Sequence, residues 1–192
     1  MRISDGGISM LKRLALIVGM LGLASAEVLA GTPGSVNVGD AAPAFSLRDR
    51  SRGLIALSDY VSARRPKQVV VIDFFRTDCK PCRSSMPKLR ALAKDFTGKP
   101  VKFIMVALLE DQEGRSKLNA FLQRNPVPFP VLVDAYGVVA KKYIRQGNGV
   151  KLPALFVIGP NGKVEGRFGY VGAEEYPKLK AHIGKLAAPL KR

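Results

Sequence analysis

The segment VVVIDFFRTDCKPC, residues 69–82, decides the fold of this chain. Its first half, Val69–Phe75, is an almost unbroken run of β-branched and aromatic residues, which is typical of a strand buried on both faces. Its second half carries Cys79 and Cys82, and apolar residues then recur at helical spacing over Met86–Phe96. The segment therefore predicts a central strand followed by a helix that begins at the two cysteines.

The two cysteines have a spacing, C-x-x-C, that suits redox chemistry. At a helix N-terminus, unpaired backbone N–H groups and the positive end of the helix dipole stabilise a thiolate, the form that attacks disulfides. Cys79 has this place and is the predicted nucleophile, while Cys82, one turn deeper, is the predicted resolving thiol. Pro81 stiffens the turn between them, and Lys80 adds a positive charge beside the thiolate. Because the chain has no other cysteine, neither a disulfide framework nor a zinc site is expected.

Strand and helix patterns alternate on both sides of this segment. Short strands at 45–48 and 54–57 predict an N-terminal hairpin, followed by a single helical turn capped within Ser58–Tyr60. Further strands are predicted at 101–108, 130–134, 154–158 and 163–170, and further helices at 116–124, 138–143 and 173–186. The turn at Gly159–Gly162 predicts two antiparallel strands, whereas the alternation before it predicts parallel ones. The expected fold class is therefore α/β, with a central mixed sheet flanked by helices.

Composition and charge indicate one globular domain with a basic surface. Of the 192 residues, 47% are hydrophobic and 24% are charged, which fits a single packed core. The net charge is +16, so nucleic acid and anionic membranes come into consideration as partners. The basic residues are scattered and only Arg64–Lys67 forms a run, so a solvated basic surface is favoured and no nucleic-acid partner is expected. The single histidine, His182, is assigned to packing or to a helix surface rather than to metal ligation.

The N-terminal residues have the pattern of an export signal. Lys12 and Arg13 precede an apolar run over 14–24, and Ala24–Ala26 provides a small-x-small cleavage pattern. We therefore predict a signal peptide over residues 1–30, with Met10 as an alternative start of the chain. The apolar run is shorter than a spanning helix requires, so an uncleaved inner-membrane anchor facing the periplasm is the less favoured alternative.

A linker and one domain follow the predicted signal. Residues 31–39 contain mainly Gly, Thr, Pro, Ser and Asn and predict a linker, and the folded domain is expected over 40–192, with packing from about Ala41. Cleavage before Glu27 or Gly31 would deliver a protein to the bacterial periplasm, a compartment that permits disulfides.

Four stretches carry a resemblance to a known family: VGDAAPAFSL at 38–47, LSDY at 57–60, VIDFFRTDCKPC at 71–82 and MPKL at 86–89. They resemble the thioredoxin superfamily, and within it the TlpA/ResA-like periplasmic thiol-disulfide oxidoreductases, over about residues 38–186. The resemblance implies a thioredoxin-like fold with an N-terminal hairpin and a central strand-helix insertion between Cys79 and Pro153. It also implies that Pro87 kinks the first helix and that Pro153 is the cis-proline facing the cysteine pair.

The same resemblance implies an activity. It implies reduction of disulfides in exported proteins by exchange through Cys79 and Cys82, with cytochrome c maturation as one such process. The implied partners are protein thiols or disulfides and an upstream membrane reductant. We expect a monomer that uses no cofactor besides the cysteine pair and no metal.

Two aspartates near the cysteines are candidate functional residues. Asp73 lies where thioredoxin carries a buried aspartate that helps to take the proton from the resolving thiol. An aspartate inside an apolar strand is costly unless it is hydrogen-bonded or used, and proton transfer is favoured over a structural hydrogen bond. Asp78 replaces the tryptophan usual before the first cysteine, and its charge is expected to raise the pKa of Cys79. Ala154 follows the proline where the family usually has Thr or Glu.

Two other activities on related folds are alternatives. A peroxiredoxin-like peroxidase shares Pro43 and Phe45, but its site requires Thr-x-x-Cys, whereas Thr77 and Cys79 are separated by one residue. A copper-binding chaperone requires C-x-x-x-C and a nearby histidine, and this chain has C-x-x-C with its histidine in another region.

Overall fold

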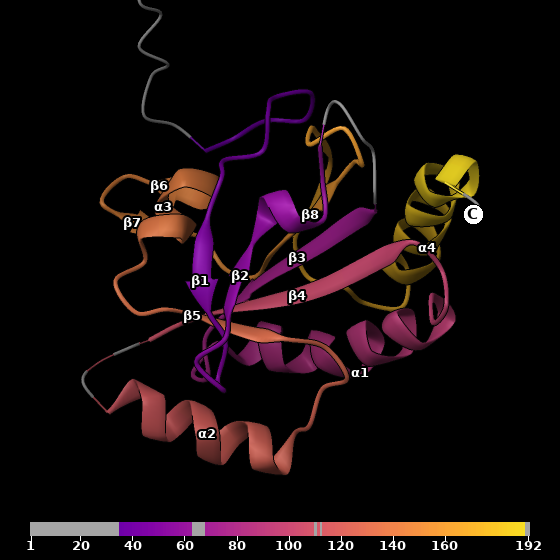
Figure 1. Ribbon diagram of the computed structural model, residues 1–192. Coiled ribbons are helices and arrows are strands. Elements are labelled where there is room, and N and C mark those ends of the chain that lie inside the picture. Colours follow the sequence, from indigo (N-terminus) through magenta and orange to yellow (C-terminus); the bar gives the residue numbers. More distant parts are fainter. Residues whose placement is uncertain (1–34, 63–67, 110, 112, 191–192) are drawn as a thin grey trace, which may run out of the picture. The chain divides into compact units, whose positions relative to one another are not determined.

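The central element is a five-stranded sheet with the strand order β5-β4-β3-β8-β9 (Figure 1). The computed structural model describes residues 35–62, 68–109, 111 and 113–190, which belong to one compact unit. The strands are β3 (Val69–Phe75), β4 (Val101–Leu108), β5 (Val131–Asp134), β8 (Ala154–Ile158) and β9 (Val164–Phe168). β3, β4 and β5 run parallel, whereas β8 pairs antiparallel with β3 and β9. The predicted mixed sheet is confirmed, and Val69–Phe75 lies in its centre.

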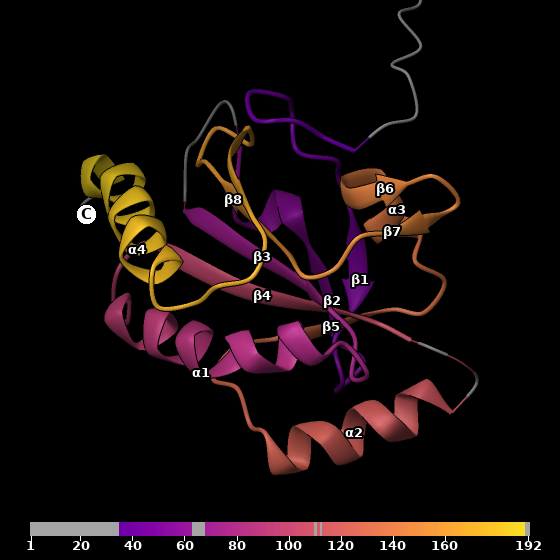
Figure 2. The same ribbon diagram turned by 180° about the vertical axis from the view of Figure 1, so that it is seen from behind.

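Helices cover one face of the sheet, and the N-terminal hairpin and one helix cover the other. The first layer contains α1 (Lys80–Asp95), α2 (Gly114–Arg124) and α4 (Glu175–Ala187), of which α1 and α4 lie in front of the sheet in Figure 2. The second layer contains β1 (Ser46–Arg48), β2 (Leu54–Ala56), the 3₁₀ turn η1 (Leu57–Asp59) and α3 (Val138–Ile144).

Strand alternation explains the two layers. Successive side chains of a strand point to opposite faces, so β3 contributes to both. Val70, Ile72 and Phe74 pack with the hairpin and α3, whereas Val69 and Val71 pack under α1 and α4. All seven residues of β3 are buried, as the unbroken apolar run predicted.

Several elements differ from the prediction. β6 (Arg145–Gln146) and β7 (Gly149–Val150) form a small hairpin that was not predicted, because two-residue strands leave no periodicity to detect. α2 begins two residues earlier than expected, and a short 3₁₀ turn, η2 (Ala188–Leu190), follows α4. The single turn after the hairpin begins at Leu57 rather than at Ser58.

Packing also begins earlier in the chain than the predicted boundary near Ala41. Val36, inside the predicted linker, is buried against the hairpin-side core, and the Gly39 N–H donates to the Val164 carbonyl at 2.8 Å. Packing extends to this segment because burial of the apolar Val36 side chain against the core is favourable. The predicted signal peptide over 1–30 and the basic run Arg64–Lys67 lie outside the described residues. Within the described ranges, no helix has both the length and the hydropathy that a membrane span requires.

Candidate active site

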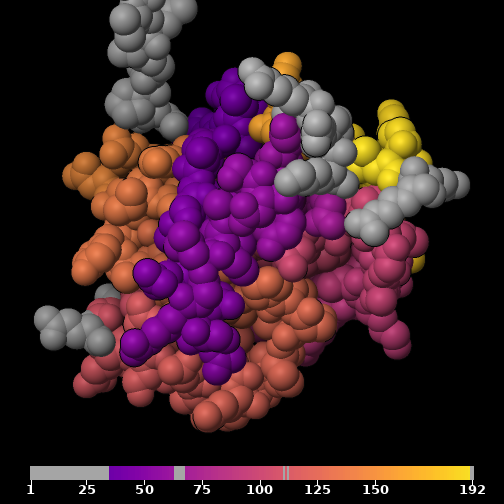
Figure 3. Space-filling view, viewed as in Figure 1, coloured from indigo at the N-terminus to yellow at the C-terminus, as the bar shows by residue number. Residues whose placement is uncertain are grey.

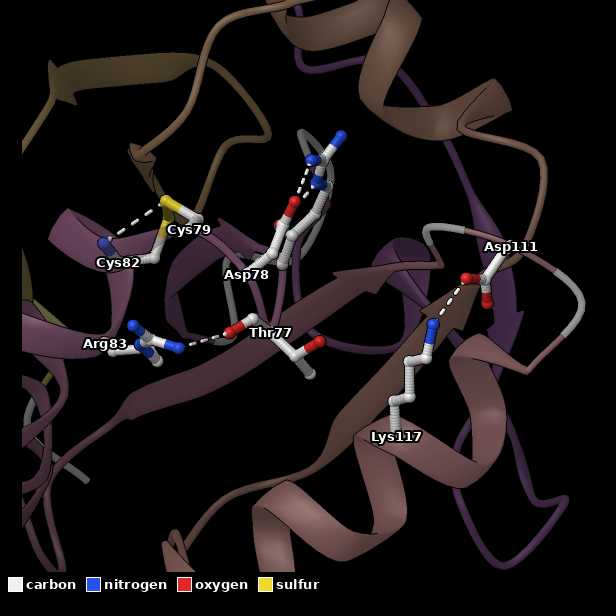
Figure 4. A network of polar contacts seen from close by, with 8 residues as sticks. Thr77, Asp78, Cys79, Cys82, Arg83, Asp111 and Lys117 are labelled. Carbon is white, nitrogen blue, oxygen red and sulfur yellow. Dashed lines mark hydrogen bonds and ion pairs between the residues drawn. A yellow bond between two sulfur atoms is a disulfide. The ribbon is translucent and has the colours of Figure 1, made fainter.

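The two cysteines form a disulfide at the start of α1 (Figure 4). Cys79 is the N-cap residue with an extended backbone, and its Sγ accepts a hydrogen bond from the Cys82 N–H at 3.3 Å. Cys79 is half-buried, whereas Cys82 is only 2% exposed. The first sulfur therefore lies at the accessible end of the helix and the second lies inside the core.

The sequence around the cysteines explains why the helix begins there. The first turn contains Pro81, whose fixed φ suits a helix start and whose missing N–H is not needed there. The Arg83 N–H donates to the Cys79 carbonyl at 3.1 Å and opens the helical ladder. Lys80 is exposed beside the disulfide, and Pro87 lies inside α1, where it removes one ladder hydrogen bond.

A serine that the sequence did not single out fixes this helix to the rest of the molecule. Ser85 is buried, and its hydroxyl donates to the Pro81 carbonyl at 3.2 Å. The same oxygen accepts the Val171 N–H at 3.1 Å, which ties the segment between β9 and α4 to the helix that carries the cysteines. Because 86 residues separate the partners, no local pattern could have revealed the contact.

Asp73 lies on the face of the sheet that α1 covers, among apolar side chains. Its neighbours on β3 are Val71 and Phe75, and the strand register places it beside Met105 and Leu155. Its carboxyl forms no hydrogen bond with any residue that the structure describes. Burial alone raises the pKa of Asp73 from 3.8 to about 8.

The environment of Asp73 also connects it to the resolving thiol. Phe75 and Met105 belong to the apolar cluster that contains Cys82, so the carboxyl borders the cluster in which that sulfur is buried. The alternative of a structural hydrogen bond finds no partner among the described residues.

Pro153 lies next to the end of the central strand. The Leu152–Pro153 peptide bond is cis. β8 pairs antiparallel with β3, with Ala154 opposite Phe74, so the register carries Pro153 to the end of β3 from which the chain continues to Cys79. Leu152 packs against the cluster that also holds Cys79. The fold thus brings the proline and the cysteine pair to the same edge of the sheet.

Asp78, immediately before the nucleophile, is paired with Arg76 (Figure 4). The Arg76 Nε donates to Asp78 Oδ1 at 2.8 Å, and a second guanidinium nitrogen contacts Oδ2. The hydrogen bonds from Arg76 hold the pKa of Asp78 below its usual range, and the charge of Arg83 adds to the effect. The expected influence of Asp78 on Cys79 is therefore offset by the guanidinium of Arg76.

His182, the single histidine, packs against β9. It lies on α4 with its ring 6.0 Å from that of Phe168, and its Nε2 has no hydrogen-bond partner among the described residues. In the same ranges, no group of three or more His, Cys, Asp or Glu side chains is placed to hold a metal ion.

Known proteins resemble this chain in sequence and in fold. The AhpC/TSA family model matches residues 38–167. The thiol-disulfide oxidoreductase ResA of Geobacillus thermodenitrificans is 35% identical over 133 residues, covering 68% of each chain. The thioredoxin-like protein YneN of Bacillus subtilis is 26% identical over 152 residues, covering 79% of this chain and 83% of that protein. Among solved structures, a protein assigned as the thiol:disulfide interchange protein DsbE of Chlorobium tepidum has a TM-score of 0.67 and 28% identity, covering 80% of this chain and 99% of that one.

These matches agree with a cysteine pair at the start of a helix beside a mixed sheet. The family model covers most of the chain. Relatives of 30% identity or more over two thirds of their length are named thiol-disulfide oxidoreductases. The chain belongs to the AhpC/TSA family and is a thiol-disulfide oxidoreductase with a thioredoxin-like fold.

Proposed function

We propose that the protein reduces disulfides of exported proteins, with Cys79 as the nucleophile and Cys82 as the resolving thiol. The observation that supports these roles is the unequal exposure of the two sulfurs, because Cys82 is 2% exposed and Cys79 is half-buried. A substrate protein can approach only the sulfur at the helix start. The helix N-terminus there favours the attacking thiolate.

Reduction takes two exchange steps. In the first, the Cys79 thiolate attacks one substrate sulfur to form a mixed disulfide, and the other substrate sulfur leaves as a thiolate that takes up a proton. In the second, the Cys82 thiol gives up its proton and its sulfur attacks the Cys79 sulfur, which releases the second substrate sulfur as a thiol. Two electrons pass to the substrate, and the protein keeps the Cys79–Cys82 disulfide described above. An upstream membrane reductant returns the pair to the dithiol.

Asp73 is proposed to accept the proton of Cys82 in the second step. Its carboxyl borders the cluster that buries Cys82, and its pKa of about 8 is close to that of an ordinary thiol. Proton transfer between groups of similar pKa is nearly balanced in free energy, which is the condition under which a general base works efficiently.

The prolines and Lys80 are proposed to shape the site around the sulfurs. Pro153 lies at the end of β3 from which the chain continues to Cys79, and it forms one side of the substrate groove. Pro81 and Pro87 restrict the helix backbone, and the exposed ammonium of Lys80 favours the Cys79 thiolate.

The proposed place of action is the periplasm. The basic pair, the apolar run over 14–24 and the small residues that follow support export by a signal peptide. The resemblance to TlpA/ResA-like proteins supports apocytochrome c or another exported thiol protein as the substrate. We propose that the protein acts as a monomer.

A trapping experiment tests the assignment of roles. Cys82→Ser should accumulate mixed disulfides through Cys79, because the first exchange step is intact and the second is blocked. Captured partners are identified by mass spectrometry after expression in the periplasm, with Cys79→Ser as the matched control. Equal capture by the two variants would show that the roles are wrongly assigned.

Two assays separate the alternatives from this proposal. The protein should reduce insulin disulfides and should not consume hydrogen peroxide, since Thr77 and Cys79 lack the spacing that a peroxidatic site requires. Retention of copper after dialysis would favour a chaperone instead.

A further inference from the structure

A groove lies between the β1–β2 hairpin on one side and α2, β5 and the start of α3 on the other. It consists of two cavities of about 710 and 540 Å³ that share Arg48, Arg115 and Val133. Its walls come from the hairpin, β5, α2 and the start of α3. Figure 3 shows the hairpin exposed on this face of the molecule, beside the orange segment that contains α3. We refer to these two neighbouring cavities as the hairpin groove.

The hairpin groove is strongly basic. Its cationic lining residues are Arg48, Arg50, Arg52, Arg115 and Lys142. In the part of the chain that the structure describes, none of these cations forms an ion pair with a carboxylate.

The acidic lining residues do not neutralise this charge by pairing with it. Asp49 accepts the Gly53 N–H at 2.8 Å, and buried Asp134 accepts the Ala140 N–H at 2.8 Å. Both carboxylates are engaged by backbone N–H groups. The groove therefore presents a net positive lining to whatever enters it.

Hydrogen bonds from two of the arginines hold part of this charge in place. Arg48 donates to the Arg52 carbonyl at 2.9 Å, and Arg50 donates to the Asn119 side-chain oxygen at 3.2 Å. Arg52 has a φ of 68°, in the left-handed region that favours glycine or asparagine. The two hydrogen bonds restrict the side chains of Arg48 and Arg50 before any ligand arrives.

The other end of the hairpin groove is apolar. Leu54, Tyr136 and Val138 line the smaller cavity, and their side chains are 64%, 85% and 54% exposed. Large apolar side chains that are exposed together at the rim of a cavity are typical of interaction sites. The combination with arginines favours a ligand that carries both carboxylates and an apolar group.

The apolar end lies at the same end of the parallel strands as the redox pair, although the two are on opposite faces of the sheet. β3 and β5 are parallel with only β4 between them, so Cys79 and Tyr136 each follow the carboxyl end of a strand at one edge. Two strand spacings amount to about 10 Å, which three or four residues of an extended peptide can span. Ala135, in the groove lining, packs against the same apolar cluster as Cys79.

We infer that the hairpin groove docks the disulfide-bearing partner protein through an acidic segment that carries an apolar side chain. The carboxylates bind at Arg48 and Arg115, the apolar side chain lies against Tyr136 and Val138, and the partner chain continues to Cys79. This inference rests on the proposed function, because it names the chemistry of the substrate that the cysteine pair reduces. Charge complementarity makes encounter faster and salt-dependent.

The test uses two short fluorescent peptides, one with several glutamates around a leucine and one with glutamines in their place. Binding to the full-length oxidised protein is measured by anisotropy at low and at physiological ionic strength. The same sequences, closed by a cysteine disulfide, then serve as substrates of the reduced protein. We expect kcat/KM to be about tenfold higher for the acidic peptide at low salt, and the preference to shrink as salt is added.

Matched variants separate the groove from the net charge of the protein. Arg48→Glu/Arg115→Glu should abolish the preference for the acidic peptide, whereas Lys178→Glu/Lys185→Glu, an equal charge change on exposed positions of α4, should retain most of it. Arg115→Glu alone, which removes no hydrogen bond seen in the structure, should reduce the preference if the double variant folds poorly. Tyr136→Ser should weaken binding of the acidic peptide a few-fold.

Three results would overturn the inference. These are equal binding of the two peptides, equal loss of the preference in both double variants, or binding of anionic phospholipid vesicles through the same arginines without any peptide preference. If neither peptide disulfide is reduced by any variant while acidic-peptide binding still depends on Arg48 and Arg115, the proposed function fails and the docking surface stands.

Discussion

Asp73→Asn tests how burial of one carboxyl affects both stability and chemistry. Burial raises the pKa of Asp73 to about 8 in the folded protein, whereas the unfolded chain has the ordinary value of 3.8. The folded state therefore holds a proton that the unfolded state releases between these two values. Protonation of Asp73 therefore stabilises the folded state relative to the unfolded state. This stabilisation is fully present below pH 3.8 and is lost as the pH rises through 8.

The size of the loss follows from linkage. Each pH unit between the two pKa values removes about 1.4 kcal/mol from the free energy of unfolding, so raising the pH from 5 to 7 removes about 3 kcal/mol. Asparagine has a similar shape but does not titrate, so the variant should not show this loss. The difference between the two proteins isolates Asp73 from every other titrating group.

The assay is urea unfolding of both oxidised proteins at several pH values between 5 and 8, at constant ionic strength. Wild type should lose stability relative to Asp73→Asn as the pH rises. Parallel curves would refute the reasoning, because they would show that the carboxyl titrates alike in the folded and unfolded states.

The same variant tests the proposed proton transfer. In the reduced protein, Asp73→Asn should slow attack by Cys82 on the mixed disulfide on the order of 100-fold, because an amide cannot accept the proton. Formation of the mixed disulfide through Cys79 should be unchanged and serves as the internal control. An unaltered second step across neutral pH would leave Asp73 without a role in the chemistry.

Two further predictions concern charge beside the nucleophile and close packing in the sheet. Asp78→Asn should lower the pKa of Cys79 and Arg76→Gln should raise it, each by about half a unit, while the double variant stays near wild type. The pH dependence of Cys79 alkylation in the reduced protein measures these shifts. If both single variants shift the pKa in the same direction, the prediction is contradicted. Gly166→Ala should destabilise by about 1–3 kcal/mol, because its Cβ would lie 2.8 Å from a phenylalanine ring carbon. Gly184→Ala inside α4, with nothing within 4 Å of the added Cβ, should stabilise by about 0.5–1 kcal/mol, and equal shifts in the urea midpoint would refute the packing argument.

Local patterns were sufficient for the elements that carry the cysteines. The apolar run Val69–Phe75 requires burial on both faces, and the spacing over Met86–Phe96 requires a helix with one buried stripe, so their types and order followed from the sequence. The place of Cys79 at the helix start followed as well. The thiol chemistry could also be predicted, because stabilisation of the Cys79 thiolate depends on the helix N-terminus, which is a local feature of the sequence.

Contacts between distant segments required the tertiary structure. The bond from Val171 to Ser85 joins segments that are far apart in the sequence, and only the strand register brings Pro153 to the end of the strand before Cys79. The hairpin groove exists because the hairpin packs beside β5, where Asp49 bridges to Leu132.

The physical reason for the division is the range of the interactions. Hydrophobic periodicity and helix capping act within a few residues and are visible in the chain itself. Scattered arginines indicate a basic surface in the sequence, but a groove forms only when packing brings Arg48 of the hairpin beside Arg115 of α2. Likewise, the aspartate at position 73 is visible in the sequence, whereas its raised pKa comes from burial under a helix that the folded sheet supports.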